Sequence, residues 1–173
     1  MALTVGTWKP TNAHSVGSQP IAERSTTAQH TLGTRVQARD VGSTDYGVGE
    51  FIYAKGVASC AAKDWVVIPS DNFTLVRAVA NSNGPVGIAM AALTASYYGW
   101  VQIYGKAIAN CLTQFADNGV VYLTATAGSV DDASVAGDWI AGALGAAGAT
   151  VGDLHTEFEL SYPFAGQRVS VAG

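Results

Sequence analysis

Residues 98–109 and 115–132 decide the fold, and they read Tyr-Gly-Trp-Val-Gln-Ile-Tyr-Gly-Lys-Ala-Ile-Ala and Phe-Ala-Asp-Asn-Gly-Val-Val-Tyr-Leu-Thr-Ala-Thr-Ala-Gly-Ser-Val-Asp-Asp. Apolar and polar side chains alternate along both segments and glycines interrupt them, which predicts three short strands joined by glycine turns. Almost none of these side chains could serve as a nucleophile, a base or a metal ligand. This combination favours a structural part over a catalyst.

Short segments of the same kind recur along the rest of the chain, at 34–39, 50–55, 65–68, 75–80, 86–92, 99–104, 106–110, 120–126 and 156–162. Many short strands with turns between them are typical of a small sandwich or barrel. We therefore predict a mainly β fold, a small β-sandwich or β-barrel-like domain with an extended N-terminal arm. Three glycines make 138–147 either a marginal short helix or a flexible loop.

Glycine, proline and asparagine residues predict the turns and irregularities of this fold. Gly105 predicts a β-bulge or a sharp bend between two strands, rather than one long strand over 99–110. Asn118-Gly119 suits the positive φ angles of a type I′ hairpin turn. Asn83-Gly84-Pro85 predicts another turn, because proline cannot donate a hydrogen bond to a neighbouring strand.

Alternation along a strand also predicts which side chains share a face. From residue 98 onward, one face carries Tyr98, Trp100 and Gln102 and the other carries Val101 and Ile103. The aromatic face is either covered by a partner or covered within the same domain. In 156–162 the apolar face is expected to carry Phe158, Leu160 and Tyr162.

Residues 1–32 differ from residues 33–173, which form the predicted β-rich domain. The first segment is rich in Thr, Ser, Gln, Asn and His, and Trp8 is its single aromatic residue. Without a helical or alternating period it reads as an extended arm that cannot form its own core. Burial of an isolated indole requires a receiving surface. Trp8 is thus an anchor into a neighbouring subunit, or it folds back onto its own domain.

Composition and charge restrict the partners. Hydrophobic residues make up 49% of the 173 residues and charged residues only 13%, against about 25% charged in a typical soluble domain. This favours a surface that is partly buried against other subunits. The net charge of −4 argues against nucleic acid as the main partner. Residues 1–39 are nevertheless basic, and they could lie along an acidic surface of a neighbour.

Neither a secretory signal nor an apolar run long enough for a membrane helix is expected. The chain is therefore expected to be made in a reducing compartment, where Cys60 and Cys111 stay as two buried thiols. His14, His30 and His155 lie far from one another and from useful ligands. The sequence contains no serine elbow, phosphate loop or EF-hand pattern. We predict no catalytic residue, no cofactor and no metal.

Four phrases, in this order, resemble a known family: Gly49-Glu-Phe-Ile-Tyr-Ala-Lys-Gly-Val-Ala-Ser, Gly84-Pro-Val-Gly-Ile-Ala-Met, Tyr98-Gly-Trp-Val-Gln-Ile-Tyr-Gly-Lys-Ala and Val121-Tyr-Leu-Thr-Ala-Thr-Ala-Gly-Ser-Val-Asp-Asp. They are similar to the capsid decoration, or cementing, proteins of tailed bacteriophage heads. The resemblance covers about residues 33–164 and leaves out the arm. Each phrase is a strand and a turn rather than a catalytic signature.

The resemblance implies a β-rich, non-enzymatic protein on the outer capsid surface of the virion, made in the cytoplasm of the host bacterium. Its partners would be the major capsid protein and further copies of itself, as a homotrimer or a dimer, with neither nucleic acid nor membrane involved. It would bridge capsid subunits and stabilise the shell. Such proteins commonly use an N-terminal arm that becomes ordered on binding.

The predicted capsid or subunit interface consists of residues in the arm and on the aromatic strand, namely Trp8, Lys9, Pro10, His14, Arg24, His30, Tyr98 and Trp100. One alternative is a carbohydrate-binding head or tail appendage that uses the aromatic residues of 97–104. Another is an enzyme built from scattered residues, for which a pocket holding His155 or a cysteine beside a carboxylate would be the sign.

Overall fold

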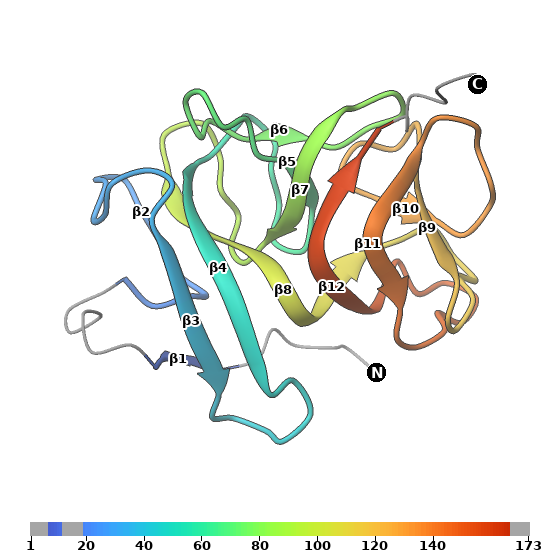
Figure 1. The fold of residues 1–173 in the computed structure, drawn as a ribbon, viewed down its shortest axis with the longest axis horizontal. Helices are drawn as coiled ribbons and strands as arrows, with labels where there is room; N and C mark the ends of the chain where they lie inside the picture. The colour runs from blue at the N-terminus through green and yellow to red at the C-terminus, as the bar shows by residue number, and fades with distance from the viewer. Residues whose placement is uncertain (1–6, 12–18, 167–173) are drawn as a thin grey trace, which may run out of the picture.

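The computed structural model describes residues 7–11 and 19–166, and every regular element in these two ranges is a strand (Figure 1). The strands are β1 (Trp8–Pro10), β2 (Arg24–Ser25), β3 (Arg35–Asp40), β4 (Val48–Lys55), β5 (Trp65–Val67), β6 (Val76–Arg77), β7 (Gly84–Ala89), β8 (Tyr98–Asn110), β9 (Val120–Leu123), β10 (Val130–Asp131), β11 (Trp139–Gly145) and β12 (His155–Ala165). The chain is therefore mainly β, as its sequence predicts.

The strands form one curled antiparallel sheet in the order β1-β3-β4-β8-β7-β12-β11-β9-β10, with β2 added to β8, and β5 and β6 added through β7. Figure 1 shows β1, β3 and β4 on one side of the molecule and β9 to β12 on the other. The curl brings distant segments together at two isolated parallel bridges, Lys55 with Thr74 and Cys111 with Val130.

Strand β8 connects the two sides of the sheet. Its first half pairs with β4, and from Tyr104 onward it pairs with β12. Between the two halves Gly105 has a φ of +92°, and the register with β4 shifts at the same level. A bulge thus lies next to Gly105, as predicted, but the expectation of two separate strands is wrong, because β8 runs from Tyr98 to Asn110 as one strand.

The core consists of three apolar clusters, and the two faces of β8 contribute to different ones. Val101 and Ile103 belong to a cluster with Ile52, Ile68 and Leu75. Trp100 belongs to a second cluster, called here the Trp100 cluster, whose buried members are Trp8, Ile21, Val36, Ala38, Phe51, Tyr53, Met90 and Trp100. A third is built around Trp65, Phe115 and Phe158. Both faces of the aromatic strand are thus covered within the chain.

Cys60 and Cys111 are buried free thiols, which confirms their predicted state. Burial raises the pKa of the Cys60 thiol to about 11 and that of Cys111 to about 12. Both thiols therefore stay protonated at neutral pH, and they behave as small apolar side chains.

The prediction of a helix or loop over 138–147 is wrong. Residues 139–145 form β11, which pairs with β12 on one side and with β9 on the other. Gly142 has a φ of +76° and lies at a register shift between Ala141 and Ala143. Pairing on both edges outweighs the weak local preference of this glycine-rich segment, which sequence alone does not reveal.

The predicted turns are displaced. At Asn118-Gly119 only Asn118 has a positive φ, and the Gly119 N–H donates to the Ala116 carbonyl at 3.0 Å. A type I′ turn needs positive φ at both central residues, so that prediction is wrong. The other turn is closed by the Ser82 N–H and the Val79 carbonyl at 2.9 Å, and Gly84 already begins β7.

The predicted apolar face of 156–162 holds for two of its three members. Phe158 and Leu160 are buried, but Tyr162 is 52% exposed. Tyr162 has a φ of +49°, which interrupts the alternation of side chains along β12. The ring therefore points out of the domain instead of into the core.

Candidate functional site

The predicted interface residues of the arm and of β8 gather largely on an inner face. Trp8 is only 7% exposed and contacts the ring of Phe51, with centroids 5.0 Å apart. Strand β1 pairs with β3, which places Trp8 opposite Asp40. Of the two alternatives for Trp8, the structure therefore shows the second one, in which the residue folds back onto its own domain. As an anchor for a neighbouring subunit the indole would first have to leave the Trp100 cluster.

Trp100, Tyr98 and His30 also contribute to this inner arrangement. Trp100 is 1% exposed, and its indole N–H donates to the carbonyl of Gln19 at 2.9 Å. His30 is half-buried against the rings of Tyr53 and Trp100, with centroids 5.0 and 5.2 Å away. The Tyr98 carbonyl accepts from the Gln19 side chain at 3.1 Å. These three residues hold segment 19–32 on the sheet, so they are not an open surface.

The remaining predicted residues differ in their surroundings. Lys9 is exposed opposite Arg39, and Pro10 lies beside Ala38. The Arg24 guanidinium donates to the Ala92 carbonyl at 2.7 Å and lies over the ring of Tyr97, 4.1 Å from its centroid. His14 lies outside the described residues. Lys9 is thus an exposed cation that lies beside a second cation, Arg39.

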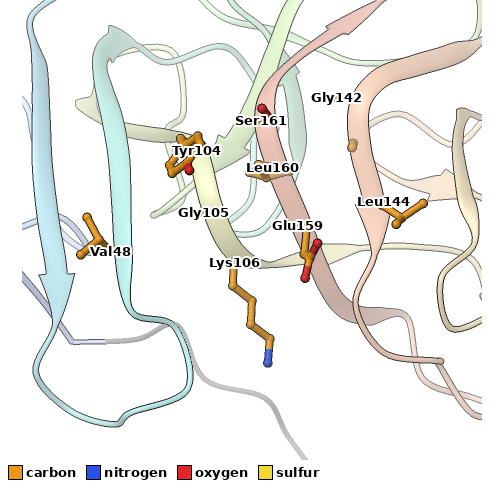
Figure 2. Close-up of a pocket in the computed structure, with 10 residues that line it drawn as sticks. Val48, Tyr104, Gly105, Lys106, Gly142, Leu144, Glu159, Leu160 and Ser161 are labelled. Atoms are coloured by element: carbon orange, nitrogen blue, oxygen red, sulfur yellow. The ribbon is translucent and has the colours of Figure 1, made fainter.

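A surface groove lies elsewhere, where β8 passes between β4 and β12 (Figure 2). This Tyr104 groove has a volume of about 540 Å³ and is lined by Val48, Tyr104, Gly105, Lys106, Gly142, Ala143, Leu144, Glu159, Leu160 and Ser161. Figure 2 shows Val48 at one border and Leu144 at the other, with Lys106 and Glu159 between them. Its borders are therefore apolar and its middle is charged.

Two glycines line the groove at positions where the backbone of a neighbouring residue approaches closely. A Cβ atom on Gly105 would lie 2.5 Å from the Val48 carbonyl oxygen, and one on Gly142 would lie 2.5 Å from that of Ser161. Both glycines also have positive φ angles. The Gln102 side chain donates to the carbonyls of Tyr104 and Lys106, at 3.1 and 3.0 Å, and so fixes the bulge from below.

Tyr104, which lines the groove, forms an aromatic pair with Tyr162, which lines a different cavity. The rings of Tyr104 and Tyr162 lie 5.4 Å apart between centroids, tilted by 34°. The Tyr162 hydroxyl donates to Glu50 Oε2 at 2.9 Å, and this hydrogen bond raises the pKa of Tyr162 above its usual value. Arg35 lies 3.6 Å from the same carboxylate. The exposed rings are thus held in fixed positions.

The charged groups of the groove differ in their pairing. Lys106 Nζ lies 2.7 Å from Glu157 Oε2, and the Tyr46 hydroxyl donates to Glu157 Oε1 at 3.0 Å. Burial, together with Glu157, raises the pKa of Tyr46, which therefore stays protonated. Glu159 faces the groove without an ion-pair partner among the described residues. It is the carboxylate available to a bound partner.

Sequence reasoning missed this groove because backbone irregularities create it. Tyr104, Leu144 and Tyr162 are exposed where φ turns positive at Gly105, Gly142 and Tyr162 itself. One signal could have pointed to it, since a glycine inside a strand marks a bulge or a close backbone approach. Gly105 carries this signal, but the three glycines at 142–148 conceal β11 as a strand.

Other kinds of site can be compared with the part of the chain that the structure describes. Within residues 7–11 and 19–166, no group of three or more His, Cys, Asp or Glu side chains could hold a metal ion, and no helix could span a membrane. His155 does not line the groove; burial lowers its pKa. No protein-family model matches the chain, and no curated protein matches it either.

Proposed function

We propose that this chain is a non-enzymatic decoration protein of a tailed-phage head, which binds the outer shell and bridges major capsid subunits. The observation that carries the proposal is the Tyr104 groove. It joins exposed apolar side chains of three strands, Val48, Tyr104 and Leu144, on a rigid sheet. A gathering of exposed apolar groups with a polar middle is typical of a protein-binding surface.

The groove suits a static, repeated contact. Its floor is backbone that the two glycines and Gln102 hold in place, so little order has to be gained on binding. Each copy would make a modest contact, and many copies on one lattice would stabilise the shell through avidity. We therefore propose the Tyr104 groove as the capsid-binding surface, in place of the arm around Trp8 that the sequence suggested.

Deletion of residues 1–30 would be a poor test, since it would remove Trp8 and Ile21 from the Trp100 cluster. A better test is cosedimentation of the purified protein with expanded heads of the phage that carries this chain. Tyr104→Ala and Leu144→Ser should weaken binding at least about tenfold. Val76→Ser changes an equally exposed residue on β6, outside the groove, and should bind like the original protein. Undiminished binding by both groove variants would refute the proposal.

A second candidate is a carbohydrate-binding appendage, favoured by the exposed Tyr104–Tyr162 pair beside Glu159 and Ser161. Aromatic faces with nearby polar groups suit sugar rings. Trp100 is too deeply buried to take part. Glycan-array binding that is lost in Tyr104→Ala, without any binding to phage heads, would favour this candidate over the first.

A further inference from the structure

A second cavity, of about 250 Å³, is lined by Tyr162 and shares no lining residue with the Tyr104 groove. It is called here the Arg35 pocket, and it is lined mainly by apolar side chains, including Ile52, Ile68, Phe73, Ile103 and Phe164. Arg35 is its single charged lining residue. The Arg35 side chain is 60% exposed, and at 3.6 Å from Glu50 it keeps guanidinium donors free.

The two most exposed large apolar side chains of the described residues lie on one turn far from this pocket. They are Val151, 79% exposed, and Leu154, 61% exposed, with Asp153 between them. An apolar tip with so much exposure gains free energy only when a partner covers it. Residues 151–154 are called here the Val151 knob.

The knob is a rigid turn rather than a loose loop. The Asp153 N–H donates to the Thr150 carbonyl at 3.1 Å, and Gly152 supplies the positive φ of +92° that the turn needs. The Gly152 N–H donates to the Thr113 hydroxyl at 3.0 Å, and the Leu154 carbonyl accepts from Cys111. A structured tip loses little conformational entropy when it binds.

Knob and pocket are complementary in size and charge. An apolar cavity of about 150 Å³ holds one benzene molecule, so the Arg35 pocket has room for the Val151 side chain and part of Leu154. Hydrogen bonds from Thr150 lower the pKa of the Asp153 carboxyl, which is therefore ionised at neutral pH. A carboxylate in this position would meet the guanidinium of Arg35 at the rim of the pocket.

The two features cannot meet within one molecule. Leu154 lies just before β12 and Phe164 lies at its other end, which separates them by roughly 30 Å at the rise of a β-strand. Figure 1 shows the two ends of β12 on opposite sides of the molecule. The pocket can therefore receive this knob only from a second copy of the chain.

We propose that the Val151 knob of one copy inserts into the Arg35 pocket of the next, with Asp153 pairing with Arg35. Such a contact joins two different surfaces, so it is head-to-tail and leaves one free knob and one free pocket on every pair. Repetition closes a ring or extends a row. The inference concerns self-association, which the family resemblance also implies, and it is independent of capsid binding.

The test uses purified full-length protein without capsids, in sedimentation velocity over a concentration series. Val151→Asp blocks the knob, and Ser70→Trp places a bulky ring at an exposed lining residue of the pocket. Each variant alone should associate at least about tenfold more weakly than the original protein. Val135→Asp, another exposed valine outside both features, should change nothing.

Mixing the two variants gives the decisive result. Val151→Asp keeps an intact pocket and Ser70→Trp keeps an intact knob, so an equimolar mixture should form a one-to-one complex that neither variant forms alone. Circular dichroism confirms that both variants are folded. A monomeric original protein over the whole concentration series, or a mixture without the complex, overturns the proposal. Either result leaves the capsid-binding test untouched.

Discussion

Trp100 and Tyr104 lie four residues apart on β8, yet one is 1% exposed and the other 43% exposed. Trp100 is covered by segment 19–32, whose Gln19 accepts the indole N–H. Tyr104 has no such cover, because the bulge at Gly105 turns the strand toward β12 just behind it. An aromatic side chain in this sheet thus becomes a surface group where the backbone bends and no other segment covers it.

The largest effect that should separate the two positions is on stability. Trp100→Ala leaves a large cavity in the Trp100 cluster and an unpaired Gln19 carbonyl, so it should lower the free energy of unfolding by about 3–5 kcal/mol. Tyr104→Ala removes a half-exposed ring and its contact with Tyr162, at a cost of about 1 kcal/mol or less. Urea unfolding followed by circular dichroism measures both, and equal losses would contradict the comparison.

A smaller effect should identify the bulge as the cause of the difference. Gly105→Ala combines a φ of +92° with a contact of 2.5 Å to the Val48 carbonyl, and should cost about 2–5 kcal/mol. Gly152 has the same φ of +92° but nothing within 4 Å of an added Cβ atom. Gly152→Ala should therefore cost only about 1–2 kcal/mol. If the two alanine variants are equally stable in urea, the close approach of β4 does not hold the bulge.

The sequence predicts the buried surroundings of Trp100 better than the exposed surroundings of Tyr104. Alternation predicts that Val101 and Ile103 lie on one face of β8 and Trp100 on the other. Both faces are buried within the domain, which was one of the two predicted alternatives for the aromatic face. The pattern is local, and a period of two needs no knowledge of neighbours. The buried, unpaired state of both cysteines also agrees with its prediction, which rests on the expected reducing compartment rather than on alternation.

The exposed surroundings of Tyr104 depend on contacts between residues far apart in sequence. Tyr162 leaves the buried face because its φ is positive, and β11 forms because β9 and β12 flank it. Neither cause is visible in a window of ten residues. The fold-back of Trp8 likewise depends on β3, some thirty residues later, as its partner strand. The groove was therefore out of reach of reasoning from local pattern alone, although the mainly β fold was not.

A further effect concerns segment 19–32, which covers Trp100. The Gln19 side chain accepts from the Tyr53 hydroxyl at 2.7 Å and donates to the carbonyls of Glu23 and Tyr98. Gln19→Ala leaves these buried groups without partners, which should cost about 1–3 kcal/mol. Because the lost bonds tie segment 19–32 to the sheet, amide exchange in that segment should accelerate more than in β12.

The side chain of Gln29 supplies the matched control, since it is exposed and bonds only within its own segment, to Ser25 and Thr27. Gln29→Ala should change stability by about 0.5 kcal/mol or less and leave exchange in 19–32 as it was. Equal acceleration in both variants, or in β12 as much as in the segment, would mean that the cover is not held by Gln19. The burial of Trp100 would then have to come from packing alone, and its difference from Tyr104 would rest on the bulge rather than on the segment that covers it.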